Sequence, residues 1–309
     1  MEIWINLEAE GIVMPRYTEY VVEKKYEALS VGSYLRIILG ISGRQIQKLT
    51  RAKGIYLNGK RTIMDKKLKY KDSLKILILQ ERLNIIPEKG KEIDILYENE
   101  SMVVVNKPAG MSVHPSGQTV SGTLINYLAG MYESEADVHL HAVNRLDRDT
   151  SGCVLFAKNA ESKQILEAGL RNGCIKRVYH AIVVGKPQPE QGTIKAKIAQ
   201  DPFSANRRIV SENGKLAVTE YRLLTELEND LWMLELNLST GRTHQIRVHL
   251  SHVGTPILGD GMYGIRKFNA KRQFLHAVKM VFSDIGVCKD MEVDAPIFDD
   301  MKEFITGKK

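Results

Sequence analysis

The sequence predicts an α+β protein in which a small α/β domain precedes a larger domain built on a mixed or antiparallel sheet. The chain has 309 residues, more than one hydrophobic core usually organises. Strand-like apolar runs follow one another in its second part, with few helical patterns between them. A stretch that mixes charge with Pro87 and Gly90 is typical of a linker. The expected divisions are a tail at 1–12, the small domain at 13–84, the linker at 85–92 and the large domain at 93–309.

The composition excludes several classes of protein. Apolar residues make up 43% of the chain, but no run of 18 or more occurs, so no membrane-spanning helix is expected. The first residues include Glu2, Glu8 and Glu10 and lack the basic segment of a secretory signal. The 3 cysteines are widely spaced and fit neither a disulfide framework nor a zinc site. A cytoplasmic location follows, and the net charge of +7 favours a polyanionic partner.

The small domain shows two helical patterns and a hairpin. A serine before an apolar periodic run is typical of a helix cap, and Asn-Gly is typical of a two-residue hairpin turn. The expected elements are a helix over 34–39 capped by Ser33, a helix over 43–52, strands over 55–57 and 60–63 joined at Asn58–Gly59, and a strand over 74–79.

The second of these helices carries a basic face. Ile46 and Leu49 share one side at helical spacing, so the basic side chains of Arg44, Lys48 and Arg51 project elsewhere. A solvated charged surface is the simplest interpretation of such a face. The order of elements, however, resembles the S-four-like RNA-binding domain, whose helix–loop face meets the phosphate backbone. The resemblance places the following residues on that face: Ser42, Arg44, Gln45, Lys48, Lys53, Asn58, Gly59 and Lys60.

In the large domain the apolar runs predict a succession of strands and one clear amphipathic helix at 160–170. Strands in runs with few helices indicate an α+β domain rather than a parallel α/β fold. The expected strands are 93–97, 102–107, 153–157, 179–184, 217–224 and 233–238.

Two polar cassettes adjoin these strands. The first, NRLDRDTSG at 144–152, precedes the apolar run at 153–157. The second, STGRTHQIRVHL at 239–250, follows the strand at 233–238. Loops held between rigid elements are where reacting groups are usually presented. The two cassettes therefore predict a composite site assembled from distant parts of one domain.

Six motifs resemble, in their order, those of the RluA/RluD-type pseudouridine synthases. They are NKPAG with VHP at 106–115, RLDRDTSG at 145–152, KRVYHAIVVG at 176–185, TGRTHQIRVHL at 240–250, GTPILGDGMYG at 254–264 and FLHA at 274–277. Two departures from the family pattern are Asn144, where a histidine is usual, and Arg177, where many members have lysine. The resemblance implies RNA as partner, no cofactor and no metal.

The resemblance implies that Asp147 carries the chemistry. A uridine must be detached from its ribose at N1, turned over and rejoined through C5, and an ionised carboxylate can start this as a nucleophile or a base. From the cassette alone, a loop aspartate that caps the turn into the following strand is the better interpretation of Asp147. Asp149 is the alternative carboxylate, with a structural role the better interpretation.

A nearby arginine would keep such a carboxylate ionised inside a closed pocket. The resemblance assigns this role to Arg247, with Arg242 as the alternative, and either could instead bind phosphate. It also implies that Ile246 packs against the target base. Tyr179 is interpretable as a core strand residue, but the resemblance places its ring on the uracil, with its hydroxyl as a candidate base.

The remaining candidates concern RNA contact. A base inside a helix must be flipped out, and the guanidinium of Arg145 could fill the vacated stack or simply contact a phosphate. Lys107 and His114 are expected to shape the pocket wall or touch phosphates. His244 and His249 have no third partner at a metal-binding spacing, so structural roles are expected for both.

Together these observations predict a monomeric RNA pseudouridine synthase. Large-subunit rRNA is the favoured substrate, because the resemblance includes an S-four-like extension often found in rRNA-directed members. A tRNA-directed synthase and a non-catalytic RNA-binding or ribosome-assembly factor remain the alternatives. A zinc deaminase is disfavoured because the required Cys-x-x-Cys and His-x-Glu pairs are missing.

Overall fold

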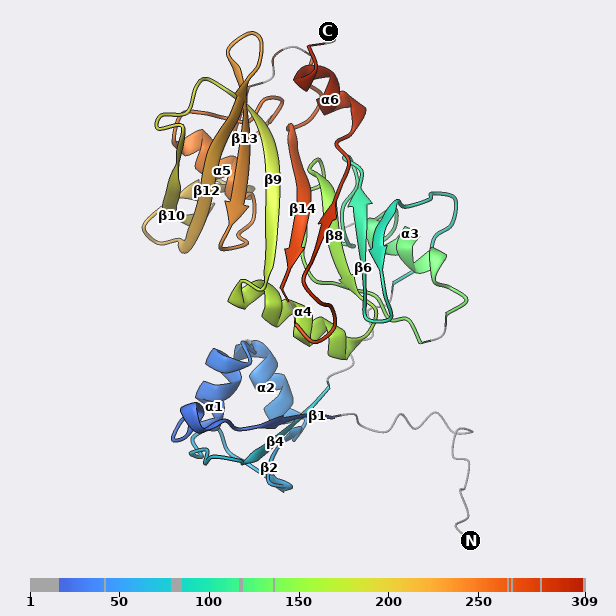
Figure 1. Cartoon of the computed structure of the whole chain (residues 1–309), viewed down its shortest axis with the longest axis vertical. Coiled ribbons are helices and arrows are strands. Elements are labelled where there is room, and N and C mark those ends of the chain that lie inside the picture. Colours follow the sequence, from blue (N-terminus) through green and yellow to red (C-terminus); the bar gives the residue numbers. More distant parts are fainter. Residues whose placement is uncertain are drawn as a thin grey trace. The chain divides into compact units, whose positions relative to one another are not determined.

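The structure is a computed structural model that describes residues 17–41, 43–78, 85–116, 119–135, 137–265, 267, 269–283 and 285–307. The chain divides into two compact units, Met1–Arg82 and Leu83–Lys309 (Figure 1). The expected tail at 1–12 and Ser42 lie outside the described residues. Within the described part, no helix combines the length and apolar character needed to cross a membrane.

The N-terminal unit packs short helical segments on an antiparallel sheet with strand order β1-β4-β2-β3. Its apolar core includes Leu35, Ile46, Leu49 and Ile76. The elements are β1 (Tyr17–Val21), η2 (Lys24–Tyr26), α1 (Val31–Ser33), η3 (Tyr34–Ile38), α2 (Gly43–Arg51), β2 (Ile55–Leu57), β3 (Lys60–Arg61) and β4 (Ser73–Leu77).

Two local predictions for this unit have different outcomes. The expected cap Ser33 is wrong, because the helix begins one turn earlier and the side chain of Ser30 accepts from Ser33 N at 3.1 Å. The hairpin is confirmed: Asn58 and Gly59 have φ of 49° and 76°, which a two-residue turn of this kind requires.

In the C-terminal unit the described residues form an 11-stranded sheet, whose main path runs β11-β10-β12-β13-β9-β14-β8-β6-β5. Its pairs are antiparallel except β14–β8, which is parallel, so the predicted mixed α+β sheet is confirmed (Figure 1). The strands of this unit are β5 (Ile95–Glu98), β6 (Met102–Lys107), β7 (His141–Ala142), β8 (Ser151–Ala157), β9 (Ile175–Val184), β10 (Gln191–Asp201), β11 (Ser204–Val210), β12 (Lys215–Glu226), β13 (Leu231–Leu238), β14 (Leu275–Phe282) and β15 (Met291–Asp294).

Four helices of the described C-terminal unit accompany the sheet: α3 (Leu124–Met131), α4 (Ala160–Asn172), α5 (Gln245–His252) and α6 (Asp299–Ile305). The predicted amphipathic helix corresponds to α4, capped by the side chain of Asn159, which accepts from Ser162 N at 2.8 Å. The second polar cassette was expected as a loop, but its last residues form α5. This helix carries polar side chains into the interior, so apolar periodicity did not reveal it.

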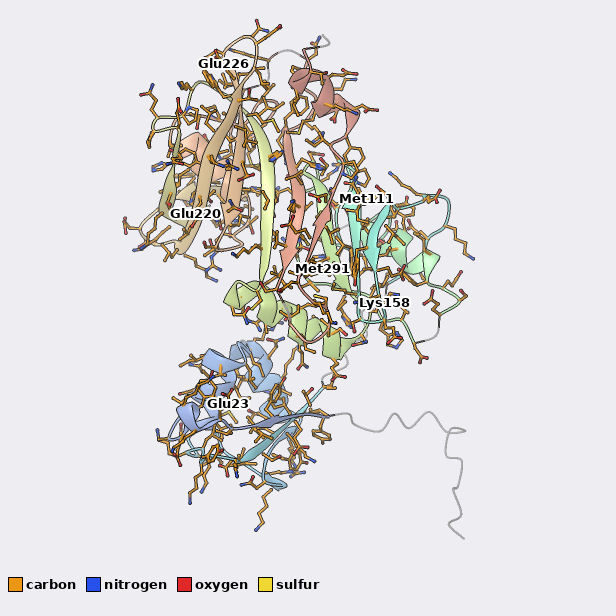
Figure 2. All side chains as sticks on the ribbon, viewed as in Figure 1. Glu23, Met111, Lys158, Glu220, Glu226 and Met291 are labelled. Carbon is orange, nitrogen blue, oxygen red and sulfur yellow. The ribbon has the colours of Figure 1, made fainter. Side chains whose placement is uncertain are left out.

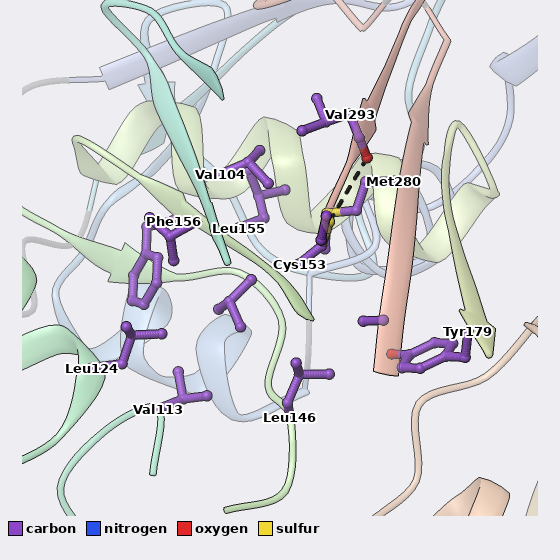
Figure 3. Packing of buried hydrophobic residues seen from close by; sticks show 14 of the residues in the cluster. Val104, Val113, Leu124, Leu146, Cys153, Leu155, Phe156, Tyr179, Met280 and Val293 are labelled. Atoms are coloured by element: carbon purple, nitrogen blue, oxygen red, sulfur yellow. Dashed lines mark hydrogen bonds between the residues drawn. The ribbon is translucent and has the colours of Figure 1, made fainter. Parts of the chain in front are cut away.

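The centre of the sheet fixes the first cassette. Every residue of β6 and β8 is buried, and these strands share an apolar cluster with Leu124, Tyr179 and Met280 (Figure 3). Gly152, at the start of β8, has φ of 107°, and a Cβ there would lie 2.3 Å from Ala277 O. Only glycine therefore allows β14 to approach where the cassette joins β8.

Candidate active site

Asp147 lies in the loop between β7 and β8, where Thr150 N donates to Asp147 O at 3.1 Å. Its side chain is 25% exposed. Arg247, on α5, donates from Nη1 to Asp147 Oδ2 at 2.9 Å. The two polar cassettes thus meet across a separation of 100 residues.

Arg242 points elsewhere. Its Nε donates to Leu216 O at 3.1 Å, and its backbone N donates to Gln245 Oε1 at 3.0 Å at the start of α5. The resemblance assigns Arg247 to the carboxylate, with Arg242 as the alternative. The structure places Arg247 there, two residues after α5 begins.

Arg247 is held from its other side by Asp260. Nε donates to Asp260 Oδ2 at 2.6 Å and Nη2 donates to Oδ1 at 2.9 Å, a bidentate pair. Asp260 is fully buried, and burial alone would raise its pKa, but the hydrogen bonds and charge of Arg247 lower it overall. Burial likewise opposes the charge of Arg247, but its bonds to Asp260 and the charge of Asp147 raise its pKa. A permanently charged guanidinium therefore bridges two carboxylates.

Tyr179 lies on β9 and is 3% exposed. Leu146, next to Asp147 in the chain, belongs to the same apolar cluster (Figure 3). Burial raises the pKa of the Tyr179 hydroxyl, the charge of Arg177 lowers it and the charge of Asp147 raises it. The hydroxyl is therefore protonated at neutral pH.

Lys107 ends β6 and is fully buried. Its Nζ donates to Pro108 O at 2.8 Å, to Met111 O at 2.8 Å and to Arg148 O at 2.9 Å. Figure 2 shows Met111 beyond one end of β6, with Lys158 at the other end. Burial lowers the pKa of Lys107 to about 7. Three backbone carbonyls surround this ammonium, so the residue ties the NKPAG turn to the Asp147 loop. Of its two expected roles, this position supports the pocket wall rather than a phosphate contact.

The part of the chain that carries Asp147 and Arg247 is similar to known proteins. A family model described as RNA pseudouridylate synthase matches residues 101–252, which include both Asp147 and Arg247. The uncharacterised RNA pseudouridine synthase YhcT of Bacillus subtilis is 36% identical over 290 residues, covering 93% of this chain and 96% of the relative. The chain belongs to the RNA pseudouridine synthase family. It is also similar to ribosomal large subunit pseudouridine synthase D of Escherichia coli, at 37% identity over 69% of each chain.

Solved structures agree on the fold of this synthase. Human RNA Pseudouridylate Synthase Domain Containing 4 aligns with a TM-score of 0.57 at 24% identity, covering 69% of this chain and 92% of the human one. Human RNA Pseudouridylate Synthase Domain Containing 1 aligns with a TM-score of 0.56 at 24% identity, covering 68% and 86%.

The other predicted site residues of the synthase divide by exposure. Arg145 is exposed two residues before Asp147, and His114 is half-buried; burial and the charge of Arg145 together lower the pKa of His114. Ile246 is 4% exposed and lies in the main apolar cluster. The contact of Ile246 with a target base stays a prediction.

Asn144, a departure from the family pattern, is a buried residue that connects the Asp147 loop to the sheet. It is 5% exposed, and its Oδ1 accepts from Leu155 N at 2.8 Å, which fastens the Asp147 loop to β8. His249 is also internal, with its Nδ1 2.9 Å from Thr219 Oγ1. The described residues contain no group of three or more His, Cys, Asp or Glu side chains placed to hold a metal ion.

Three residues that sequence reasoning did not assign to the site lie within it: Asp260, Tyr263 and His244. The first two belong to the GTPILGDGMYG motif, which was recognised as a motif but given no role. Tyr263 places its ring 5.0 Å from the guanidinium carbon of Arg247. His244 was expected to be structural, but its Nε2 lies 3.9 Å from Asp147 Oδ1.

Proposed function

We propose that this enzyme converts uridines of large-subunit rRNA into pseudouridine, with Asp147 as the carboxylate that starts cleavage of the glycosidic bond. The observation that carries this proposal is the pair formed by Asp147 and Arg247. Arg247 binds only Oδ2 of the carboxylate, at 2.9 Å. Among the described residues Oδ1 accepts no hydrogen bond, so one oxygen is available to a flipped nucleotide while the other is anchored.

Tyr179 is proposed to stack on the uracil. Its position beside the Asp147 loop in the buried cluster supports an aromatic contact. Because burial raises its pKa, the hydroxyl is protonated at neutral pH. It can take up the proton released from C5 only by passing its own proton on, so stacking is the better supported of its two roles.

Arg145 is proposed to fill the space left by the flipped base. It is exposed and close enough to the site for its charge to lower the pKa of His114. A planar guanidinium can stack in a helix and hydrogen-bond the unpaired partner base. Contact with a phosphate alone is the alternative role.

The substrate assignment rests on the relatives. The Escherichia coli relative is named for the ribosomal large subunit, which favours rRNA over tRNA as the substrate here. The complete set of Asp147, Tyr179 and Arg247 disfavours a non-catalytic RNA-binding factor. A monomeric, cytoplasmic enzyme is part of the proposal, and the three cysteines are free, as expected in a reducing compartment.

Tritium release from RNA labelled with [5-³H]uridine tests the activity. The purified enzyme should release tritium from large-subunit rRNA transcripts and not from tRNA. Release from tRNA alone would make tRNA the substrate, and no release from either RNA would support the non-catalytic alternative. Mapping pseudouridines in RNA from a deletion strain would then locate the target uridines.

The basic face of the N-terminal unit is proposed to bind the RNA backbone. Arg44, Lys48 and Arg51 on α2 and Lys60 on β3 are all exposed. Basic side chains that contact phosphates release counterions, so affinity falls as salt rises.

Charge reversal tests this face in the full chain. Replacing Arg44, Lys48 and Arg51 by glutamate should weaken RNA binding and reduce the slope of log affinity against log salt by about one unit per lost contact. Reversing Lys66, Lys67 and Lys69, exposed in the same unit, changes the net charge equally and serves as the matched control. Equal effects of the two sets would show that net charge, and not the basic face of α2, determines RNA affinity.

A further inference from the structure

A chain of hydrogen bonds ends at His244, immediately before α5. Arg208 N, on β11, donates to the Tyr263 hydroxyl at 2.7 Å. The same hydroxyl lies 2.9 Å from His244 Nδ1, and the opposite ring nitrogen, Nε2, lies 3.9 Å from Asp147 Oδ1. These hydrogen bonds thus connect a backbone amide of the sheet, through Tyr263, to His244. The other ring nitrogen of His244 faces the carboxylate oxygen that Arg247 does not hold.

The direction of these hydrogen bonds fixes the tautomer of His244. A backbone N–H can only donate, so the Tyr263 oxygen accepts from Arg208 and keeps its own proton to donate. The described residues offer that proton one acceptor, His244 Nδ1. An imidazole whose Nδ1 accepts carries its proton on Nε2 when it is neutral. The Nε2–H therefore faces Asp147 Oδ1.

The protonation state is consistent with this arrangement. Burial lowers the pKa of His244, although the charge of Asp147 opposes this shift, while the charges of Arg247 and Arg208 reinforce it. The ring is therefore neutral at pH 7, and its Nδ1 lone pair can accept from Tyr263.

The backbone of His244 is held in an uncommon conformation. Its φ of 57° and ψ of 20° lie in the left-handed region, which residues other than glycine seldom adopt. Strain of this kind persists where the surrounding structure imposes it, and it clusters at functional sites. Here it places the ring between Tyr263, packed edge-on at 5.6 Å between centroids, and Asp147.

We propose that His244 is a positioning residue for Asp147, with Tyr263 fixing its tautomer so that Nε2–H faces the reactive oxygen. This inference rests on the proposed function of Asp147. At 3.9 Å the contact is longer than a hydrogen bond, and the proposal requires the carboxylate to turn toward Nε2 when substrate binds. Arg247 then holds one oxygen and His244 aims the other, which restricts the carboxylate to one orientation.

Tyr263→Phe is the most selective test, because it deletes one hydroxyl and keeps the ring beside Arg247. Nitrogen-15 NMR of labelled histidine should show Nε2–H in the wild-type protein and loss of that preference in the variant. Turnover number should fall roughly tenfold with KM nearly unchanged, since the defect lies in aiming a catalytic group. Tyr221→Phe removes a comparable hydroxyl, which donates to Pro189 O at 3.1 Å, and should change neither quantity.

His244→Asn provides a second variant, because asparagine tolerates the left-handed backbone but cannot reach both Tyr263 and Asp147. It should retain folding and RNA affinity while its turnover number falls at least as far as that of Tyr263→Phe. A wild-type ring protonated on Nδ1, or unchanged turnover in both variants, would overturn the proposal. Absence of tritium release by the wild-type enzyme would instead refute the proposed function, while the NMR result would still report the tautomer.

Discussion

Two buried cations flank the Asp147 loop, and the protein holds them in different ways. Arg247 lies between two carboxylates, Asp147 and Asp260. Lys107 donates to three backbone carbonyls and forms no ion pair among the described residues. The pKa of Arg247 is raised by its partners, whereas burial lowers the pKa of Lys107 to about 7.

We propose that the difference separates a charge used for chemistry, on Arg247, from a charge used for structure, on Lys107. Carboxylates raise the pKa of the arginine that they bind, and the guanidinium in turn orients Asp147 through its hydrogen bond to Oδ2. Carbonyl oxygens satisfy the donors of an ammonium without cancelling its charge. We therefore expect substitutions at Arg247 to alter turnover and substitutions at Lys107 to alter stability.

Among substitutions at the two buried cations and at Asp260, the largest effect is expected from Arg247→Met. Asp147 would lose its anchoring charge, and turnover should fall by about 10²–10³-fold, as for loss of one preorganised electrostatic partner. Tritium release under single-turnover conditions measures this. Arg242→Met is the matched control and should retain near wild-type turnover, because Arg242 donates to Leu216 O and not to the carboxylate. If Arg242→Met were the crippling change, the ion pair would be misassigned.

Asp260→Asn should have an intermediate effect. The guanidinium of Arg247 would keep Asp147 but lose its bidentate anchor, so turnover should fall roughly tenfold through misplacement. The free energy of unfolding should fall by about 3 kcal/mol, because one partner of a buried pair is removed. Denaturant unfolding and tritium release measure the two quantities. Wild-type values for both would show that Asp147 alone holds Arg247.

Lys107→Met should change turnover least. Three carbonyls of the NKPAG turn and the Asp147 loop would lose their donor, at a cost of about 1–3 kcal/mol in unfolding free energy. The folded-state pKa of about 7 is below the ordinary lysine value, so the unfolded chain binds more protons between pH 7 and 10. As the pH increases over that range, the free energy of unfolding of the wild-type protein should therefore rise relative to that of the variant by about 1 kcal/mol per pH unit. A pH-independent difference would contradict the account of Lys107.

Much of the fold was predictable because apolar runs mark buried strands. The run at 102–107 became β6 without change, and the run at 153–157 lies within β8. The hairpin β10–β11 and the helices α3 and α6 were not predicted. On β11, for example, Val210 packs with Tyr263 against a small cluster of Ile198, Ala217 and Val248, which local periodicity does not reveal.

The site was predictable in its residue types and less so in its geometry. The motifs pointed to Asp147 and favoured Arg247, but showing that Arg247 and not Arg242 reaches the carboxylate required the position at which α5 begins. Lys107 ends the predicted strand at 102–107, where the sequence left a pocket wall or a phosphate as its surroundings, and only the structure shows that three carbonyls bury it. The position of His244 beside Asp147 depends on a left-handed backbone conformation, which no pattern of polar residues predicts.

The central claim, that Asp147 carries the chemistry, is tested most directly by comparing Asp147→Asn with Asp149→Asn. Both substitutions remove one charge and little volume from the same loop. Single-turnover tritium release, with RNA affinity measured in parallel, should show loss of turnover in Asp147→Asn alone and unchanged affinity in both. Turnover retained by Asp147→Asn and lost by Asp149→Asn would contradict the account and move the catalytic carboxylate two residues along the loop.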